Sequence, residues 1–91
     1  MEELDAFRSQ LDELDAELVA LVARRLQICD QVAALKRRNG IPMMQPGRVE
    51  QVKWRAIARG AELGLSEPFV EQLYALIIAE ACRREDAIIG A

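Results

Sequence analysis

Residues 3 to 38 contain neither glycine nor proline, and this stretch constrains the fold more than any other part of the chain. Apolar residues recur within it at spacings of three and four, which is the heptad pattern of a helix that packs along another helix. They are Leu4, Phe7, Leu11, Leu14, Leu18, Leu21, Ile28, Val32 and Leu35, with one gap at position 25. Acidic residues at the start, and basic residues followed by Asn39-Gly40 at the end, predict where this helix begins and ends.

A helix of this length is too long for the chain to cover by itself. At about 1.5 Å per residue it spans roughly 50 Å, whereas a compact globule of 91 residues is on the order of 30 Å across or less. The remaining residues cannot cover the apolar seam, and a chain of this size gains stability from oligomerisation. We therefore expect an obligate, intertwined homodimer in which a second chain lies along the first.

Two further helices are expected after the long one. Pro46 is well placed to start the second helix, and the glycines at 60 and 64 bring it to an end. Ser66 is a suitable N-cap for the third helix, in which apolar residues recur at helical spacing as far as Ile88. Because no strand pattern or internal repeat is present, the sequence predicts an all-α fold with a long, a short and a medium helix.

Composition narrows the classes of function. The single domain expected over residues 1–91 is 52% hydrophobic and 30% charged, as in a globular chain. The net charge is −3, whereas proteins that bind nucleic acid usually have a basic surface. No apolar run approaches the roughly 20 residues that cross a bilayer, and no signal-peptide pattern stands at the start. We therefore expect a cytoplasmic protein that binds neither nucleic acid nor membrane.

The cysteines and the missing histidine restrict the chemistry. Cys29 and Cys82 fall within helical patterns, which favours free, buried thiols in a reducing compartment over a disulfide. Without histidine, two cysteines make a zinc site improbable. A Ser-His or Cys-His nucleophile cannot be built at all. We expect neither a metal nor a cofactor.

Two cations share the apolar face of the long helix. Arg25 fills the gap in the seam between Leu21 and Ile28, and Lys36 follows three turns later, about 16 Å along the same face. An arginine in an apolar core needs an anion, so Arg25 either pairs with an acid of the protein or binds an anionic ligand. The residues between the two cations are modest in size, which favours a slot for a compact dianion.

Two other polar residues stand near apolar faces. Arg8 precedes Arg25 by about 25 Å along the helix, too far to share a small ligand within one chain. An antiparallel partner helix would bring the partner's Arg8 close to Arg25 and complete two equal sites, although Arg8 is otherwise an ordinary surface residue. Glu85 lies on the apolar side of the third helix, where an acid is either partly solvated or buried and protonated.

The joint spacing of these residues resembles the all-α chorismate mutase class, a dimer of intertwined three-helix chains. It also resembles the isochorismate-pyruvate lyases built on the same scaffold. The resemblance covers essentially the whole chain and rests on "FRSQLDELDAELVALVARRLQICDQVAALK", on the loop before "GRVEQV", and on "LSEPFVEQLYALIIAEACRRED". The loop "IPMMQPGRV" further resembles the 4-amino-4-deoxychorismate mutases of arylamine antibiotic pathways.

The resemblance implies how a small dianionic substrate is bound. The partner's Arg8 and Arg25 would bind its two carboxylates, and Lys36 would contact the enol-ether oxygen and a carboxylate. Arg48 would close the site from the proline-bearing loop, which would act as a lid. Glu85 stands where many mutases have a glutamine that donates to the ether oxygen.

The resemblance also locates the residues around the substrate's C4 substituent. Gln45 would offer a backbone contact there, but Val49 replaces the glutamate that usually meets the C4 hydroxyl, and Ala81 replaces a small polar residue. A valine accepts no hydrogen bond, which favours 4-amino-4-deoxychorismate over chorismate. The lyases also lack that glutamate, and Glu50 is a candidate acceptor for a C4 ammonium.

Three functions follow as expectations. The first is a Claisen rearrangement of chorismate or 4-amino-4-deoxychorismate, which needs orientation and electrostatic stabilisation but no nucleophile, metal or proton relay. The second is the isochorismate-pyruvate lyase reaction. The third is a helical dimerisation module without a ligand, in which Arg25 would be paired inside the protein.

Overall fold

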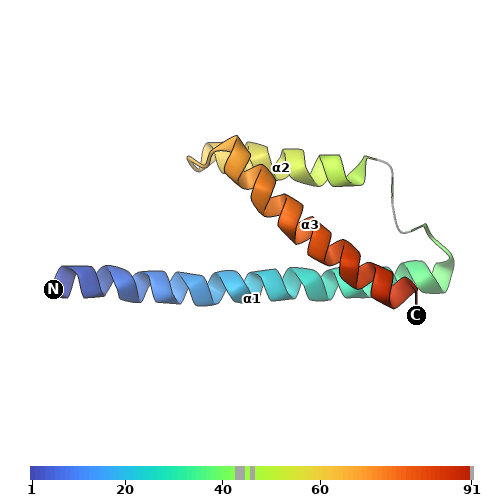
Figure 1. The fold of residues 1–91 in the computed structure, drawn as a ribbon, viewed down its shortest axis with the longest axis horizontal. Helices are drawn as coiled ribbons and strands as arrows, with labels where there is room; N and C mark the ends of the chain where they lie inside the picture. The colour runs from blue at the N-terminus through green and yellow to red at the C-terminus, as the bar shows by residue number, and fades with distance from the viewer. Residues whose placement is uncertain (43–44, 46, 91) are drawn as a thin grey trace.

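The computed structural model describes residues 1–42, 45 and 47–90. Within these residues it consists of three helices, α1 (Glu2–Asn39), α2 (Arg48–Glu62) and α3 (Glu67–Ile89), with no strand. The all-α class and the order of a long, a short and a medium helix are therefore confirmed. The chain measures 57 × 25 × 15 Å, and α1 runs along its longest dimension (Figure 1).

The helix ends follow the signals in the sequence. α1 stops at Gly40, which has the left-handed φ of 64° that closes many helices, and its N–H donates to the carbonyl oxygen of Lys36. Ser66 caps α3, because its Oγ accepts a hydrogen bond from the Phe69 N–H at 3.4 Å. α2 ends at Glu62, between the two glycines, as expected. Pro46, the expected start signal of α2, lies outside the described residues.

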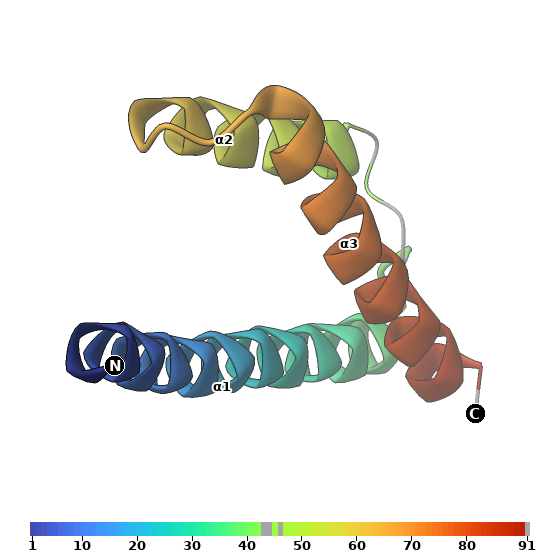
Figure 2. The same cartoon turned by 60° about the vertical axis from the view of Figure 1, so that its left-hand side comes forward.

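α3 connects the other two helices. It packs on the C-terminal half of α1 and on α2, whereas α1 and α2 do not touch each other in the described parts of the chain. Figures 1 and 2 show α1 and α2 as two separate arms with α3 running diagonally between them. The N-terminal half of α1 consequently projects past the rest of the molecule.

Small side chains bring α1 and α3 into close contact. Ala33 of α1 is completely buried and Ala81 of α3 nearly so. Polar contacts flank the crossing: the Arg84 guanidinium donates two hydrogen bonds to the Asp30 carboxylate, and Arg37 donates to the carbonyl oxygen of Ile88 at 3.2 Å. This crossing fixes the relative position of the two helices that carry most of the charged site.

The single chain leaves the predicted seam uncovered. Among the described residues only four hydrophobic side chains are buried, and these are Leu26, Ala33, Val70 and Ala81. Every residue of the seam is exposed, from 39% for Val32 to 62% for Phe7 and Leu21. A continuous apolar face of this length is typical of an interaction surface. No described helix combines the length and apolar character needed to span a membrane.

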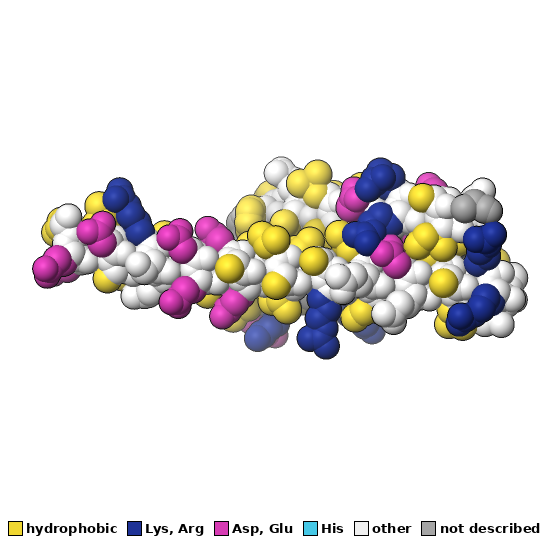
Figure 3. Space-filling model, turned by 90° about the horizontal axis from the view of Figure 1, so that it is seen from below, with side chains coloured by type: hydrophobic (Ala, Val, Ile, Leu, Met, Phe, Trp, Pro, Cys, Tyr) yellow, Lys and Arg dark blue, Asp and Glu magenta, His cyan; other side chains and the backbone are white. Residues whose placement is uncertain are grey.

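Charge is also unevenly distributed along the molecule. Most of the acidic side chains on the face shown in Figure 3 lie along the projecting half of α1, and most of the basic ones lie on the other half of the molecule. The first twenty residues contain seven acids and one cation, Arg8. The projecting half of α1 therefore carries both an apolar seam and an excess of negative charge.

The crossing of α1 and α3 makes a first testable prediction. Ala33→Leu forces three more carbon atoms into a site without free space, so the free energy of unfolding should fall by about 1–3 kcal/mol. Urea denaturation at one fixed protein concentration measures the change. Ala20→Leu makes the same substitution at an exposed position of α1 and should stay within about 0.5 kcal/mol of the parent. Equal effects of the two changes would contradict this account of the crossing.

Candidate functional site

A cavity of about 330 Å³ lies between the C-terminal half of α1, the start of α2 and the last turns of α3. Seven of the eight site residues predicted from the sequence line it: Arg25, Lys36, Gln45, Arg48, Val49, Ala81 and Glu85. The eighth, Arg8, lies on the projecting half of α1 with 67% of its side chain exposed and a nitrogen 3.9 Å from Asp5. One chain alone therefore does not bring Arg8 to the cavity.

Arg25 faces the cavity without a carboxylate partner. None of the ion pairs formed by the described residues includes it. Its guanidinium lies 5.8 Å from the ring centroid of Tyr74, a cation–π distance, and one of its nitrogens is 3.9 Å from the Cys29 sulfur. Internal pairing, the alternative that would make Arg25 purely structural, is therefore not observed among these residues.

Lys36 and Glu85 meet at the α1–α3 side of the cavity. Nζ of Lys36 lies 3.7 Å from Oε1 of Glu85, and the two side chains are only 15% and 13% exposed. Removing two charges from water is costly, and such a pair is weak evidence of a purely stabilising role. The Glu85 side chain is therefore largely shielded from water and forms an ion pair with Lys36.

The start of α2 supplies the opposite wall. Gly47 adopts a left-handed φ of 78° directly before the helix, and the Arg48 N–H donates to the Gln45 carbonyl oxygen at 3.1 Å. The Arg48 guanidinium donates to Oε1 of Gln51 at 2.8 Å, and Nε2 of Gln45 donates to the Pro42 carbonyl oxygen at 3.1 Å. These contacts hold a cation and an amide at the mouth of the cavity.

Two expectations about this wall have different outcomes. Glu50, the candidate acceptor for a C4 ammonium, is exposed and does not line the cavity, so that suggestion was wrong. Because Glu50 stands one position after Val49, its side chain leaves the helix in another direction. Met43, Met44 and Pro46 lie outside the described residues, and closure of this loop as a lid stays a prediction.

The lining suits an anion attached to an apolar ring. Arg25, Lys36 and Arg48 supply three positive charges, and Glu85 is the one acid among the described lining residues. The remaining lining residues are apolar or weakly polar: Ile28, Cys29, Val32, Gln45, Val49, Val52, Ile78, Ala81 and Cys82. A positive excess inside apolar walls strengthens the attraction for a negatively charged ligand.

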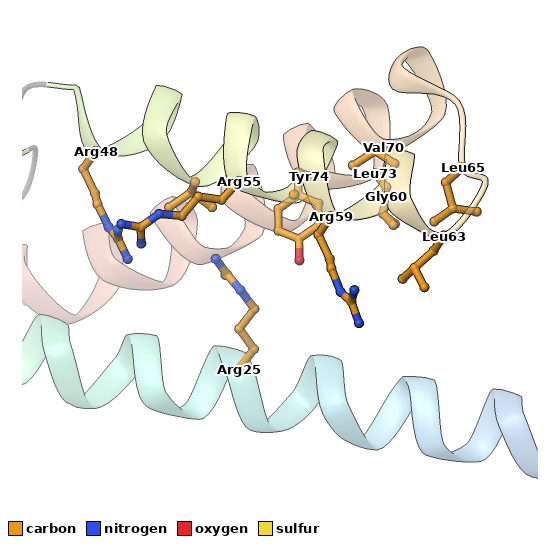
Figure 4. A pocket seen from close by; sticks show the side chains of 12 residues that line it. Arg25, Arg48, Arg55, Arg59, Gly60, Leu63, Leu65, Val70, Leu73 and Tyr74 are labelled. Carbon is orange, nitrogen blue, oxygen red and sulfur yellow. The ribbon is translucent and has the colours of Figure 1, made fainter.

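A second cavity, of about 440 Å³, adjoins the first and is formed by α2, α3 and Arg25 of α1. Arg25 and Arg48 line both cavities, and Arg55 and Arg59 are added from α2. Figure 4 shows Arg48 and Arg59 extending from α2 toward α1, and Arg55 extending toward Arg48. Sequence reasoning missed Arg55 and Arg59. Their spacing of seven and eleven residues after Arg48, which places all three on one helix face, could have identified them.

The surroundings of Cys82 do not activate its thiol as a nucleophile. Cys29 and Cys82 are free, as expected. Burial raises the pKa of the Cys82 thiol above its usual range, and the nearby carboxylates of Glu85 and Asp86 raise that pKa further. A thiol with a raised pKa carries little thiolate at neutral pH. Among the described residues no group of carboxylates or thiols is arranged to hold a metal ion.

Comparison with known proteins agrees with this geometry. Residues 7–86 match the family profile of Chorismate mutase type II. A 4-amino-4-deoxychorismate mutase of Streptomyces venezuelae is 47% identical over 88 residues, which cover 97% of this chain and 85% of that protein. A 4-amino-4-deoxychorismate mutase of Streptomyces pristinaespiralis is 44% identical over 87 residues, covering 96% of this chain and 67% of that protein.

A more distant relative has the same segment within a longer chain. A T-protein of Haemophilus influenzae is 30% identical over 86 residues, which cover 94% of this chain but 23% of that protein. The profile match extends over nearly all of α1, all of α2 and most of α3, and so includes every described residue that lines the 330 Å³ cavity. The chain belongs to the chorismate mutase type II family.

Proposed function

We propose that this protein is a 4-amino-4-deoxychorismate mutase, which rearranges its substrate to 4-amino-4-deoxyprephenate. Membership of the family makes the chain an isomerase. The observation that carries the proposal is the convergence of three cations and one acid on a single cavity that Val49 also lines. Two relatives more than 40% identical over nearly the whole chain bear this name.

The first task of the protein is to hold a flexible substrate in its reactive shape. In the rearrangement the enol-ether C–O bond breaks while a C–C bond forms between the side chain and the ring, and no atom is lost. Arg25 and the partner's Arg8 would bind the two carboxylates, and Arg48 on the opposite wall of the cavity would close the site and hold the side chain over the ring. Fixing two reacting carbons near contact distance removes much of the entropic barrier.

The second task is to stabilise negative charge on the ether oxygen as its bond breaks. Lys36 and Glu85 lie together and both line the cavity, so both can reach the ether oxygen of a substrate bound there. The lysine would donate a charged hydrogen bond, and Glu85 would add a second donor when it carries a proton.

The third task is recognition of the C4 substituent. Val49 lines the cavity without a hydrogen-bonding group, and Glu50 lies outside it. Gln45 donates its Nε2 to the Pro42 carbonyl, which orients the amide and leaves Oε1 as an acceptor. We assign this oxygen the role of binding the C4 ammonium of the substrate.

A second chain would complete the site. The exposed seam of α1, the cavity that α2 and α3 form beside Arg25, and the position of Arg8 on the projecting half of α1 all support an antiparallel dimer. In that dimer the partner's Arg8 would enter the cavity beside Arg25. Each substrate would then be held by arginines from both chains, as two-fold symmetry requires of two equal sites.

The assay that tests the proposed function compares three pure substrates. With 4-amino-4-deoxychorismate the product should have the substrate's mass and a rearranged carbon skeleton by NMR. Chorismate should react with a kcat/KM at least about tenfold lower, because its C4 hydroxyl meets Val49 in place of the usual acceptor. Pyruvate and salicylate from isochorismate would identify a lyase. A preference for chorismate would refute the substrate assignment.

Sharing of the site between chains makes a separate prediction. Arg25→Ala and Arg8→Ala should each abolish turnover, yet a mixture of the two variants should regain roughly a quarter of the parent activity. Half of a statistical mixture is heterodimer, and one of its two sites contains both arginines. Mass spectrometry must show subunit exchange, and Arg38→Ala serves as a control at an exposed position outside the cavity. Heterodimers without activity would rule out a shared site.

The mechanism assigns no covalent step to the cysteines, which can be tested by alkylation. In a Cys29→Ser variant, iodoacetamide reacts only with Cys82 as its thiolate. Because burial raises the pKa of this thiol, its alkylation rate should rise with pH along a curve displaced to higher pH than that of a cysteine peptide. Mass spectrometry between about pH 7 and 10 gives both curves. A midpoint at or below the peptide's would contradict the unreactive role of Cys82.

A further inference from the structure

Charges of opposite sign on α1 and α2 have no ion-pair partner on another helix among the described residues. Arg55 forms no ion pair with any of these residues, and Arg59 pairs only with the exposed Glu62 on its own helix, at 3.0 Å. Asp15, on the projecting half of α1, likewise takes part in none of these ion pairs. Both arginines line the cavity of about 440 Å³ that α2 and α3 form together with Arg25 of α1 (Figure 4).

The shared site sets the register of a partner helix. In that dimer the partner's Arg8 lies at the level of Arg25, so two antiparallel copies related by a two-fold axis bring residue i opposite residue 33 − i. The axis then falls between Leu14 and Leu18, two exposed residues of the seam.

Asp15 on the partner's α1 and the arginines on α2 are displaced along their helices in the same direction and by similar distances. The partner's α1 is antiparallel to α1, and α2 also runs opposite to α1 (Figure 1), so the partner's α1 and α2 point the same way. Asp15 follows Arg8 by seven residues, two turns on the same helix face. Arg55 and Arg59 follow Arg48 by seven and eleven residues. Along the helix axis, Asp15 lies about 10 Å beyond Arg8, and Arg55 and Arg59 lie about 10 and 16 Å beyond Arg48.

We propose that the partner's Asp15 binds between Arg55 and Arg59, and that this contact sets the register in which the partner's Arg8 reaches the substrate cavity. The inference rests on the shared-site dimer proposed above and adds a positioning contact to it. Two guanidinium groups one helical turn apart form charge-assisted hydrogen bonds to one carboxylate. Complementary charge of this kind selects the orientation of an interface as well as its affinity.

A charge-reversal exchange tests the contact. Asp15→Arg alone, and Arg55→Asp with Arg59→Asp, should each weaken self-association at least tenfold, because like charges then meet at both contacts. In a mixture of the two chains every contact of the heterodimer joins opposite charges. Sedimentation should therefore recover a dimer close to the parent's affinity, with kcat/KM for 4-amino-4-deoxychorismate restored to within about threefold.

A matched control separates this contact from general charge attraction. Glu13→Arg introduces the same charge two residues earlier, on the opposite face of α1, and it should not rescue the chain that carries Arg55→Asp and Arg59→Asp. Equal rescue by both variants, or no rescue by Asp15→Arg, would overturn the proposal. Parent protein that is dimeric and active in the same assay leaves the proposed function standing in either case.

If a charge-reversed chain does not fold, substitutions that only remove the charge test the same contact. Asp15→Asn, Arg55→Gln with Arg59→Gln, and their combination form a double-mutant cycle that changes no side-chain shape greatly. The combined change should weaken the dimer no more than either part does, and it should raise KM in the same proportion as Asp15→Asn alone. Strictly additive losses would show that these groups do not meet.

Discussion

The close crossing of α1 and α3 is the contact on which the rest of the structure depends. It forms because alanines stand where the helices meet, Ala33 on one and Ala81 on the other. The same approach brings Lys36 within 3.7 Å of Glu85 and lets Arg84 reach Asp30. Larger side chains at the crossing would separate the helices and, with them, the two groups assigned to the ether oxygen.

This arrangement explains how an enzyme without histidine or a reactive thiol can work. A rearrangement within one molecule requires no group that attacks, accepts or carries a fragment. It requires fixed charges in a place from which water is largely excluded, where they need not reorganise during the reaction. Helices satisfy this requirement well, since Arg25, Lys36 and Glu85 extend from backbone that is already fully hydrogen-bonded.

Much of the fold was predictable because its signals are local. The absence of glycine and proline across α1, the closing Gly40 and the capping Ser66 act through neighbouring backbone, so the sequence alone specified those boundaries. The residues of the cavity were predictable from their joint spacing together with the family resemblance. Glu50 was misjudged because the direction of a side chain next to a helix start depends on how α2 sits against α3.

Other features depend on contacts that no local pattern specifies. The cavity of about 440 Å³ depends on the angle at which α3 connects α2 to α1, because α2, α3 and Arg25 of α1 line it. The placement of Arg55 and Arg59 becomes informative only when that cavity is known. The role proposed for Arg8 involves a second copy of the chain, which no local pattern specifies.

The separation of α1 from α2 also bears on how such an enzyme can change its substrate. The wall proposed to meet the C4 substituent is built on Gln45 and Val49, before and within the first turn of α2, while the wall proposed to meet the ether oxygen is built on α1 and α3. Since α2 packs on α3 but not on α1, substitutions at the first wall can leave the Lys36 side of the second undisturbed. New ring substituents can thus be accommodated by evolution without rebuilding the groups that promote the rearrangement.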